Sequence, residues 1–256
     1  MSDGKQLEYE EEEESVGQQR VPREDGTELP LKEGAVFGTI AVVATYLSHL
    51  YLTIVASAQA TPTTYTDGDT TVVTDLVSSW VAAGWSYLST FGVGFEASGE
   101  AATLGQAPNN VAAITNVPFT LATTALFAVT VGTVVAAGYG IARYTDADDP
   151  VEAVKAGLTV VPPYLVFAAL AAFLMTHDYS DPQLVGRIVD SVGPLEAGQF
   201  FNDEGNVVSN LTFGPSMTDA VLFAGVIFPA AFAVAGALST QWEEVVDTAI
   251  AKVNER

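Results

Sequence analysis

Residues 118–142 read PFTLATTALFAVTVGTVVAAGYGIA, and these 25 residues contain no charged side chain. A helix of that length crosses the hydrocarbon core of a bilayer, so we predict a transmembrane span. Small residues recur at every fourth position and predict a ridge at which a neighbouring helix packs closely, namely Thr124, Ala128, Gly132, Ala136 and Gly140. Because Ala, Gly and Thr are abundant in this chain, such a stripe also arises by chance, and the predicted span does not depend on it.

Three further apolar segments have the length of a span, at residues 35–57, 156–175 and 220–238. Together with 118–142 they predict an all-α membrane protein, a bundle of four transmembrane helices within residues 34–239. Pro162 and Pro163 near the start of the third span, and Pro229 in the fourth, remove backbone donors and predict irregular helices. The carbonyls that they free either line a binding site or lie in helices that are merely bent.

The chain combines 49% hydrophobic residues with 31 acidic and only 9 basic ones, a formal net charge of -22. The acidic residues occur in every segment outside the apolar runs, which is typical of proteins adapted to high salt. We therefore expect a halophilic, archaeal source. Acidic segments that bind basic partners would explain the N-terminal tail but not the even spread. Nucleic acid is an unsuitable partner for so negative a protein.

The segments outside the spans differ in character. Residues 1–33 are acidic and lack an apolar period, which predicts a disordered tail. Residues 76–95 and 184–195 in the two outer loops predict amphipathic helices that lie along the membrane interface. Residues 240–256 predict a cytoplasmic amphipathic helix that begins with a capping box. The small residues after the first span resemble a signal-peptide cleavage site, but its apolar run is longer than in a usual signal peptide.

The basic residues predict the orientation in the membrane. With four spans and both termini in the cytoplasm, eight of the nine cations lie inside and only Arg187 lies outside. A fifth span at residues 76–95 would remove this bias, so we predict four. The sequon that begins at Asn210 then lies outside and is a candidate glycosylation site, although its closeness to the fourth span disfavours its use.

His49 is the sharpest candidate for chemistry, because an ionisable side chain inside a span is costly and marks proton or substrate paths. The alternative, which we favour, is a neutral imidazole that hydrogen-bonds to a neighbouring helix, because no acidic residue lies inside any span. Asp219, at the outer start of the fourth span, is the nearest acidic residue and is predicted to be a solvated helix cap.

No motif of an enzyme is present: the chain has no nucleotide-binding loop, no zinc-protease motif and no nucleophile elbow. It has no cysteine, which excludes thiolate metal sites. It has two histidines, His49 and His177, and this small number disfavours histidine-based catalysis. We predict no catalytic residue, no cofactor and no metal site. The outer aspartates lack the spacing of a calcium loop.

The segment Leu29-Pro-Leu-Lys-Glu-Gly-Ala35, followed by a span with Gly and Tyr, resembles the opening of a family of small, uncharacterised multi-spanning haloarchaeal membrane proteins. Some of its members carry transporter labels. The resemblance implies a location in the cell membrane and a fold type, and no activity. It covers the four-span layout and the acidic tail and includes no specific motif.

Two functions remain open. In the first, the chain is an accessory or scaffold subunit that binds a membrane protein partner or a second copy of itself. In the second, it transports a small solute or ion along a path near His49, Pro162, Pro163 and Pro229. The scarcity of polar residues inside the spans favours the first, or else an uncharged substrate. Scattered identities at an offset of 96 residues, between the second and fourth spans, are also compatible with duplicated hairpins, as in some transporters.

Overall fold

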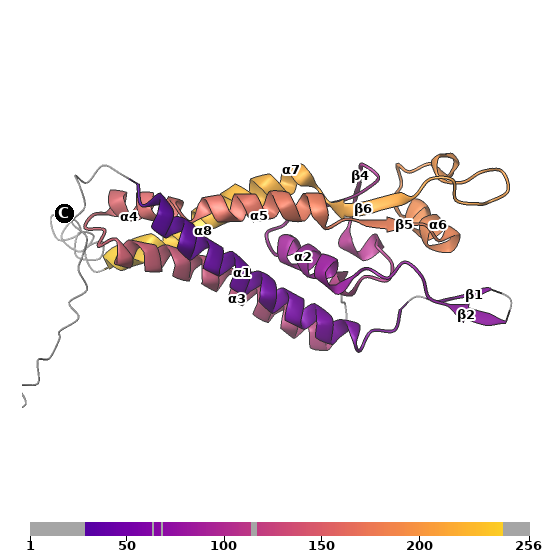
Figure 1. Ribbon diagram of the computed structural model, residues 1–256, viewed down its shortest axis with the longest axis horizontal. Helices are drawn as coiled ribbons and strands as arrows, with labels where there is room; N and C mark the ends of the chain where they lie inside the picture. The colour runs from indigo at the N-terminus through magenta and orange to yellow at the C-terminus, as the bar shows by residue number, and fades with distance from the viewer. Residues whose placement is uncertain (1–28, 63, 68, 114–116, 243–256) are drawn as a thin grey trace, which may run out of the picture.

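The computed structural model describes residues 29–62, 64–67, 69–113 and 117–242. Within them, four helical segments are long and apolar enough to cross a membrane: Leu31–Ser57, Ala122–Tyr144, Pro150–Leu174 and Met217–Gln241. These segments run alongside one another and form an elongated body (Figure 1). The prediction of four apolar spans is therefore confirmed. Most of the predicted tail 1–33 and of the helix 240–256 lies outside the described residues.

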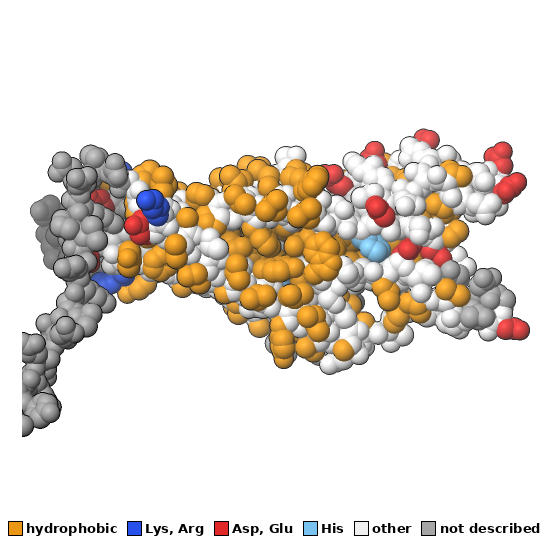
Figure 2. Space-filling model, in the orientation of Figure 1, with side chains coloured by type: hydrophobic (Ala, Val, Ile, Leu, Met, Phe, Trp, Pro, Cys, Tyr) orange, Lys and Arg blue, Asp and Glu red, His pale blue; other side chains and the backbone are white. Residues whose placement is uncertain are grey.

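The first two spans are each a single helix. They are α1 (Leu31–Ser57) and α3 (Val117–Tyr144). Figure 2 shows hydrophobic side chains over the middle of the body, as expected for a surface that faces lipid. The basic side chains in this view gather at the end where α1 begins.

The third span is broken where its two prolines predict an irregularity. It consists of α4 (Pro150–Leu158) and α5 (Val161–Leu174), separated by Thr159 and Val160. α4 starts as the Asp-Pro pair predicts, because the Asp149 carboxylate accepts hydrogen bonds from the N–H groups of Val151 and Glu152 at 2.7 and 2.9 Å.

The fourth span is irregular along half of its length. After one turn of α7 (Met217–Asp219) it continues as a π-helix, η4 (Ala220–Ile227), then as α8 (Phe228–Leu238) and a 3₁₀ turn, η5 (Ser239–Gln241). Pro229 is the second residue after the π-helix, and it has no N–H to bond to the carbonyl of Gly225, four residues earlier. The N–H of Phe228 bonds to the carbonyl of Phe223, five residues earlier.

The closest helix packing in the bundle depends on glycine. A Cβ atom on Gly138 of α3 would lie 1.9 Å from the carbonyl oxygen of Ala233, and one on Gly236 of α8 would lie 2.0 Å from that of Val135. The two backbones touch here, and any side chain would separate them.

The predicted ridge lies on a different face of α3. Thr124, Ala128, Gly132 and Ala136 are exposed, and a Cβ on Gly132 would meet nothing within 4 Å. A Cβ on Gly140 would lie 2.7 Å from the Phe37 ring. Within this chain the ridge is therefore not the packing surface that the four-residue pattern suggested, because the packed face of α3 follows Thr130, Val134 and Gly138 instead.

A small sheet joins the two long loops, one after α1 and one after α5, at the end of the bundle that we name the outer end. The prediction of an all-α chain missed this sheet. Its strand order is β4-β3-β6-β5 and all pairs are antiparallel. The central pair joins Phe95 to Pro215, so the first loop is bonded to the second. The strands are β3 (Phe95–Ala97), β4 (Glu100–Ala102), β5 (His177–Tyr179) and β6 (Leu211–Pro215); a separate hairpin comprises β1 (Tyr65–Asp67) and β2 (Thr70–Val72).

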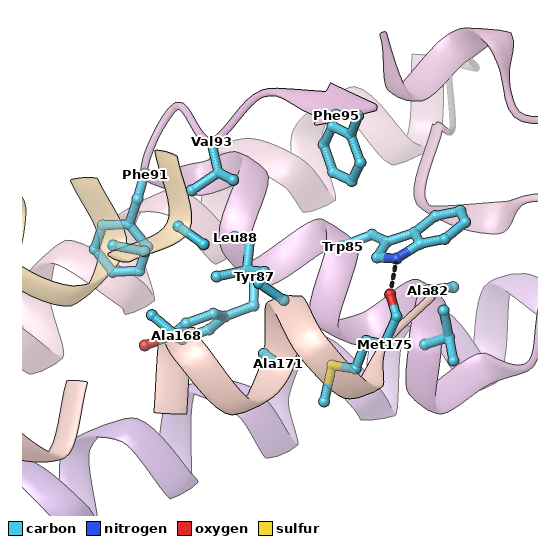
Figure 3. Close-up of a cluster of buried hydrophobic side chains, with 14 of the residues drawn as sticks. Ala82, Trp85, Tyr87, Leu88, Phe91, Val93, Phe95, Ala168, Ala171 and Met175 are labelled. Carbon is cyan, nitrogen blue, oxygen red and sulfur yellow. Dashed lines mark hydrogen bonds between the residues drawn. The ribbon is translucent and has the colours of Figure 1, made fainter. Parts of the chain in front are cut away.

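The helices of the outer loops pack into the protein. α2 (Ser79–Thr90) has 12 residues, about 18 Å, and is too short to span a bilayer. Its Trp85 is fully buried and donates a hydrogen bond from Nε1 to the Met175 carbonyl at 2.6 Å (Figure 3). Trp80, by contrast, is exposed. α2 therefore does not simply lie on the membrane surface as predicted.

The second loop helix, α6 (Pro182–Ser191), has the amphipathic pattern that the sequence predicts, and Asp181 caps it through the N–H groups of Gln183 and Leu184. Its apolar side chains are buried in the protein core, with exposures of 8% or less: Leu184, Val185, Ile188 and Val189. They are covered by protein, so this face is not available to lipid. Short 3₁₀ turns complete the outer part, η1 (Leu104–Gln106), η2 (Val111–Ala113) and η3 (Ala197–Gln199).

Candidate functional site: the polar network around His49

His49 lies in the interior of the bundle and is fully buried. Its Nδ1 is 2.8 Å from the hydroxyl of Ser86 on α2, and its Nε2 is 3.1 Å from the hydroxyl of Thr130 on α3. The ring also meets the edge of the Tyr87 ring, with centroids 5.7 Å apart. One imidazole thus connects three helices, and both of its nitrogens have partners.

The partners define the tautomer. The Thr130 hydroxyl donates its proton to the Leu126 carbonyl at 2.8 Å, so it accepts from Nε2–H of His49. Nδ1 then carries no proton and accepts from Ser86. This assignment describes a neutral histidine with every hydrogen bond satisfied, as favoured from the sequence.

The network continues along one face of α1. The Thr53 hydroxyl, one turn from His49, is shared between the carbonyls of Leu50 and His49 in its own helix, at 2.9 and 3.0 Å, and that of Ser79 on α2, at 3.2 Å. The Ser57 hydroxyl, a turn further, lies 3.1 Å from the Ser79 hydroxyl. On the other side, Tyr46 donates to the Trp80 carbonyl at 3.1 Å. Spacing of four residues places these groups on the same side of the helix. The outer half of α1 therefore presents polar groups to α2, while its inner half presents Gly34 and Gly38.

A small pocket lies beside this network. Its polar lining comes from Thr53, Ser86 and Thr123 and its apolar lining includes Leu52 and Leu126. It has room for about one water molecule. Because Ser86 also bonds to His49, the pocket adjoins the histidine through a single hydroxyl.

The prolines predicted near a transport path are not gathered around His49. A Cβ on Gly38 would lie 2.5 Å from the Val160 carbonyl oxygen and 3.0 Å from Pro163, so the break in the third span is packed tightly against α1. His49 is 11 residues further along that helix, about 16 Å. Pro162 is exposed and Pro229 is buried, and neither takes part in the described contacts of His49.

Asp219 does not act as the predicted solvated cap. Its carboxylate accepts a hydrogen bond from the N–H of Gly94, 125 residues away, at 3.2 Å. It makes no capping bond within its own helix, and Ser216 precedes that helix instead. Asp219 therefore holds the segment between α2 and β3 against the start of the fourth span.

A second polar cluster joins the outer loops. The Asp75 carboxylate accepts hydrogen bonds from the N–H groups of Ser180 and Asp181, both at 2.8 Å, and the Asp75 carbonyl lies 3.2 Å from Nε2 of His177. Burial lowers the pKa of His177, and this effect outweighs the opposing influence of Asp75 and Asp178. Asp75 has a positive φ of 47°, a strained conformation for a residue other than glycine. Nothing in the sequence marked this contact between loops.

The remaining candidates are possible metal ligands and the sequon that begins at Asn210. Among the described residues, no group of three His, Asp or Glu side chains is placed to hold a metal ion. Asn210 of the sequon is exposed, but the Thr212 hydroxyl donates a hydrogen bond to the Asp178 carboxylate at 2.6 Å.

A family model matches residues 13–244, nearly the whole chain. The chain belongs to DUF7978, a family of unknown function. No curated protein and no solved structure matches it. Membership in DUF7978 agrees with the expected uncharacterised family and adds no assigned activity. The four apolar helices of this DUF7978 chain are compatible with a multi-pass membrane protein.

Proposed function

We propose that this protein is an accessory or scaffold subunit of a complex in the cell membrane of a halophilic archaeon. The observation that carries the proposal is the exposed small-residue face of α3, at Thr124, Ala128, Gly132 and Ala136. The chain itself packs α3 through a different face, so this one is left for another helix. Such faces permit close helix association in bilayers, where apolar burial contributes little.

The orientation in this proposal has both termini in the cytoplasm. It is supported by the positions of the cations: Lys32 precedes the buried part of α1, Arg143 ends α3 and Lys155 lies on α4, whereas Arg187 lies on α6 among the outer elements. An excess of cations on one side is the usual signature of the cytoplasmic face.

The interior supports a subunit role over a transport role. His49 has both nitrogens occupied and is fully buried, and the break at Pro162 and Pro163 is filled by α1. A transporter for a small solute or ion remains the second candidate, because the pocket at Thr53 and Ser86 adjoins His49. For that function His49→Leu would abolish flux in vesicles while the protein stays folded. Loss of folding instead would assign His49 to packing.

The test of the subunit role is purification in mild detergent at high salt, with mass spectrometry of whatever remains bound. Gly132→Leu places a large side chain on the proposed face, and Ala44→Leu makes the same kind of change at an exposed position of α1. We expect a stoichiometric membrane protein partner with the natural chain and with Ala44→Leu, and its loss with Gly132→Leu. A homogeneous preparation of this chain alone, or equal partner binding by both variants, would overturn the proposal.

A further inference from the structure

Three hydroxyl groups in the bundle interior have no hydrogen-bond partner among the described residues. They belong to Thr45 of α1, Tyr87 of α2 and Tyr164 of α5, and each residue is 1% exposed. An unsatisfied buried hydroxyl destabilises the folded protein, and native proteins rarely leave such groups without a partner. Three on neighbouring elements of one bundle therefore indicate a ligand that supplies the missing bonds.

The three residues are placed near one another by the rings of Tyr87 and Phe167. The Tyr87 ring lies 5.0 Å from that of Phe167 on α5 and 5.7 Å from that of His49, which follows Thr45 by one turn on the same face of α1. Tyr164 precedes Phe167 by three residues and so lies on the same side of the helix. In Figure 3 the Tyr87 ring extends over α5 with its hydroxyl next to Ala168. The three hydroxyls thus come from the surfaces at which α1, α2 and α5 meet.

The chemistry of the three groups selects the ligand. Each hydroxyl both donates and accepts a hydrogen bond, and none carries a charge at neutral pH. His49, one turn from Thr45, is already satisfied by Ser86 and Thr130 and leaves no charge to attract an ion. A small neutral molecule with donors and acceptors fits this set, and water is the one always present.

We propose that the hydroxyls of Thr45, Tyr87 and Tyr164 form a buried water-binding site, the interior hydroxyl site, between α1, α2 and α5. Water bound there joins the three helices and hydrates the bundle on the inner side of His49. This inference does not depend on the role of the exposed face of α3, and either holds without the other.

The first test is X-ray radiolytic labelling of the purified full-length protein in H₂¹⁸O, with mass spectrometry of the tyrosines. Radicals form from bound water where it lies, so a buried tyrosine next to water is oxidised and one enclosed by protein is protected. Tyr179 is the matched control, because it is fully buried and its hydroxyl donates to the Pro108 carbonyl at 2.7 Å. We expect labelling of Tyr87 and Tyr164 several-fold above that of Tyr179. Equal protection of all three would overturn the site.

The second test removes single oxygens. Tyr87→Phe and Tyr164→Phe should each lower the melting temperature, and together by less than the sum, because both hydroxyls bind the same water. If the hydroxyls are bare, Phe removes an unsatisfied polar group and the melting temperature rises. Tyr179→Phe, which loses a protein hydrogen bond, is the reference for a lowered value. A rise in both single variants would overturn the proposal.

Discussion

The bundle has an inner half, around Gly34, Gly38 and Gly138, and an outer half, around α2 and the sheet. Different interactions hold these two halves together. At the inner half, glycines bring backbones into contact, Gly34 and Gly38 against Thr159 and Val160, and Gly138 against Ala233. At the outer half, α2 lies among the spans and fills the space with aromatic rings and hydrogen bonds. The difference teaches that a helix too short to span a bilayer can still pack among helices that are long enough to do so.

This division has an energetic reason. Between helices in lipid, apolar burial gives little net gain, so stability comes from close packing or from interhelical hydrogen bonds. Close packing requires small residues and excludes a fifth helix. Hydrogen bonding requires polar side chains, and α1 supplies them at Thr53 and His49, where α2 is present. The buried face of α1 therefore carries glycines in its first half, for close packing, and polar side chains in its second half, for hydrogen bonds.

The largest effect is expected at the inner crossing. Gly138→Ala places a methyl group 1.9 Å from the Ala233 carbonyl oxygen, where backbone must move, and overpacking of this kind costs about 3 kcal/mol. Gly132→Ala on the same helix meets nothing within 4 Å and should leave stability unchanged. Thermal unfolding in detergent compares the two. Equal melting temperatures would show that the crossing is not tight, and the contrast between the halves would fail.

A smaller loss is expected where α2 is fixed to the outer half. Trp85→Phe removes the N–H that bonds to the Met175 carbonyl and leaves that buried acceptor without its partner, at a cost of about 1–3 kcal/mol. Trp80→Phe changes an exposed indole on the same helix and should shift stability by less than about 0.5 kcal/mol. Chemical denaturation of both variants gives the difference. If Trp80→Phe costs as much as Trp85→Phe, burial of α2 in the bundle is not what holds it.

The spans were predictable because length and absence of charge decide them. Residues 118–142 and 220–238 need no partner to be recognised, and Asp149 and Asp181 before prolines marked helix starts correctly. The break at Pro162 followed from a missing N–H, which is a local property.

The sheet was missed because it depends on partners distant in sequence. β3 and β4 have three residues each, too few to show a period of two, and β3 pairs with β6 more than a hundred residues away. The packed face of α3 was missed for a similar reason. A four-residue repeat of small residues marks a stripe, but which stripe faces inward depends on where Ala233 lies.

The candidate site was predictable in part. His49 was identified as costly inside a span, and hydrogen bonding to a neighbouring helix was the favoured alternative. Its particular partners were not foreseeable, because Ser86 lies on a helix expected at the membrane surface. The contact of Asp75 with Ser180 and Asp181, likewise, joins two loops whose sequences give no signal of each other.

The smallest change in stability is expected when the pH is lowered. It is confined to the outer end of the bundle. Burial lowers the pKa of His177, so the folded protein binds its proton less readily than the unfolded chain, whose histidine titrates near about 6.5. His177 thus contributes stability that is fully present above that pH and is lost as pH falls below it. In His177→Gln this loss between neutral and mildly acid pH should be smaller than in the natural chain. Hydrogen exchange of β5 and β6 at two pH values, with the amides around Gly138 as the internal reference, measures it. If the inner crossing loosens with acid as much as the sheet does, the two halves do not unfold separately and the comparison between them fails.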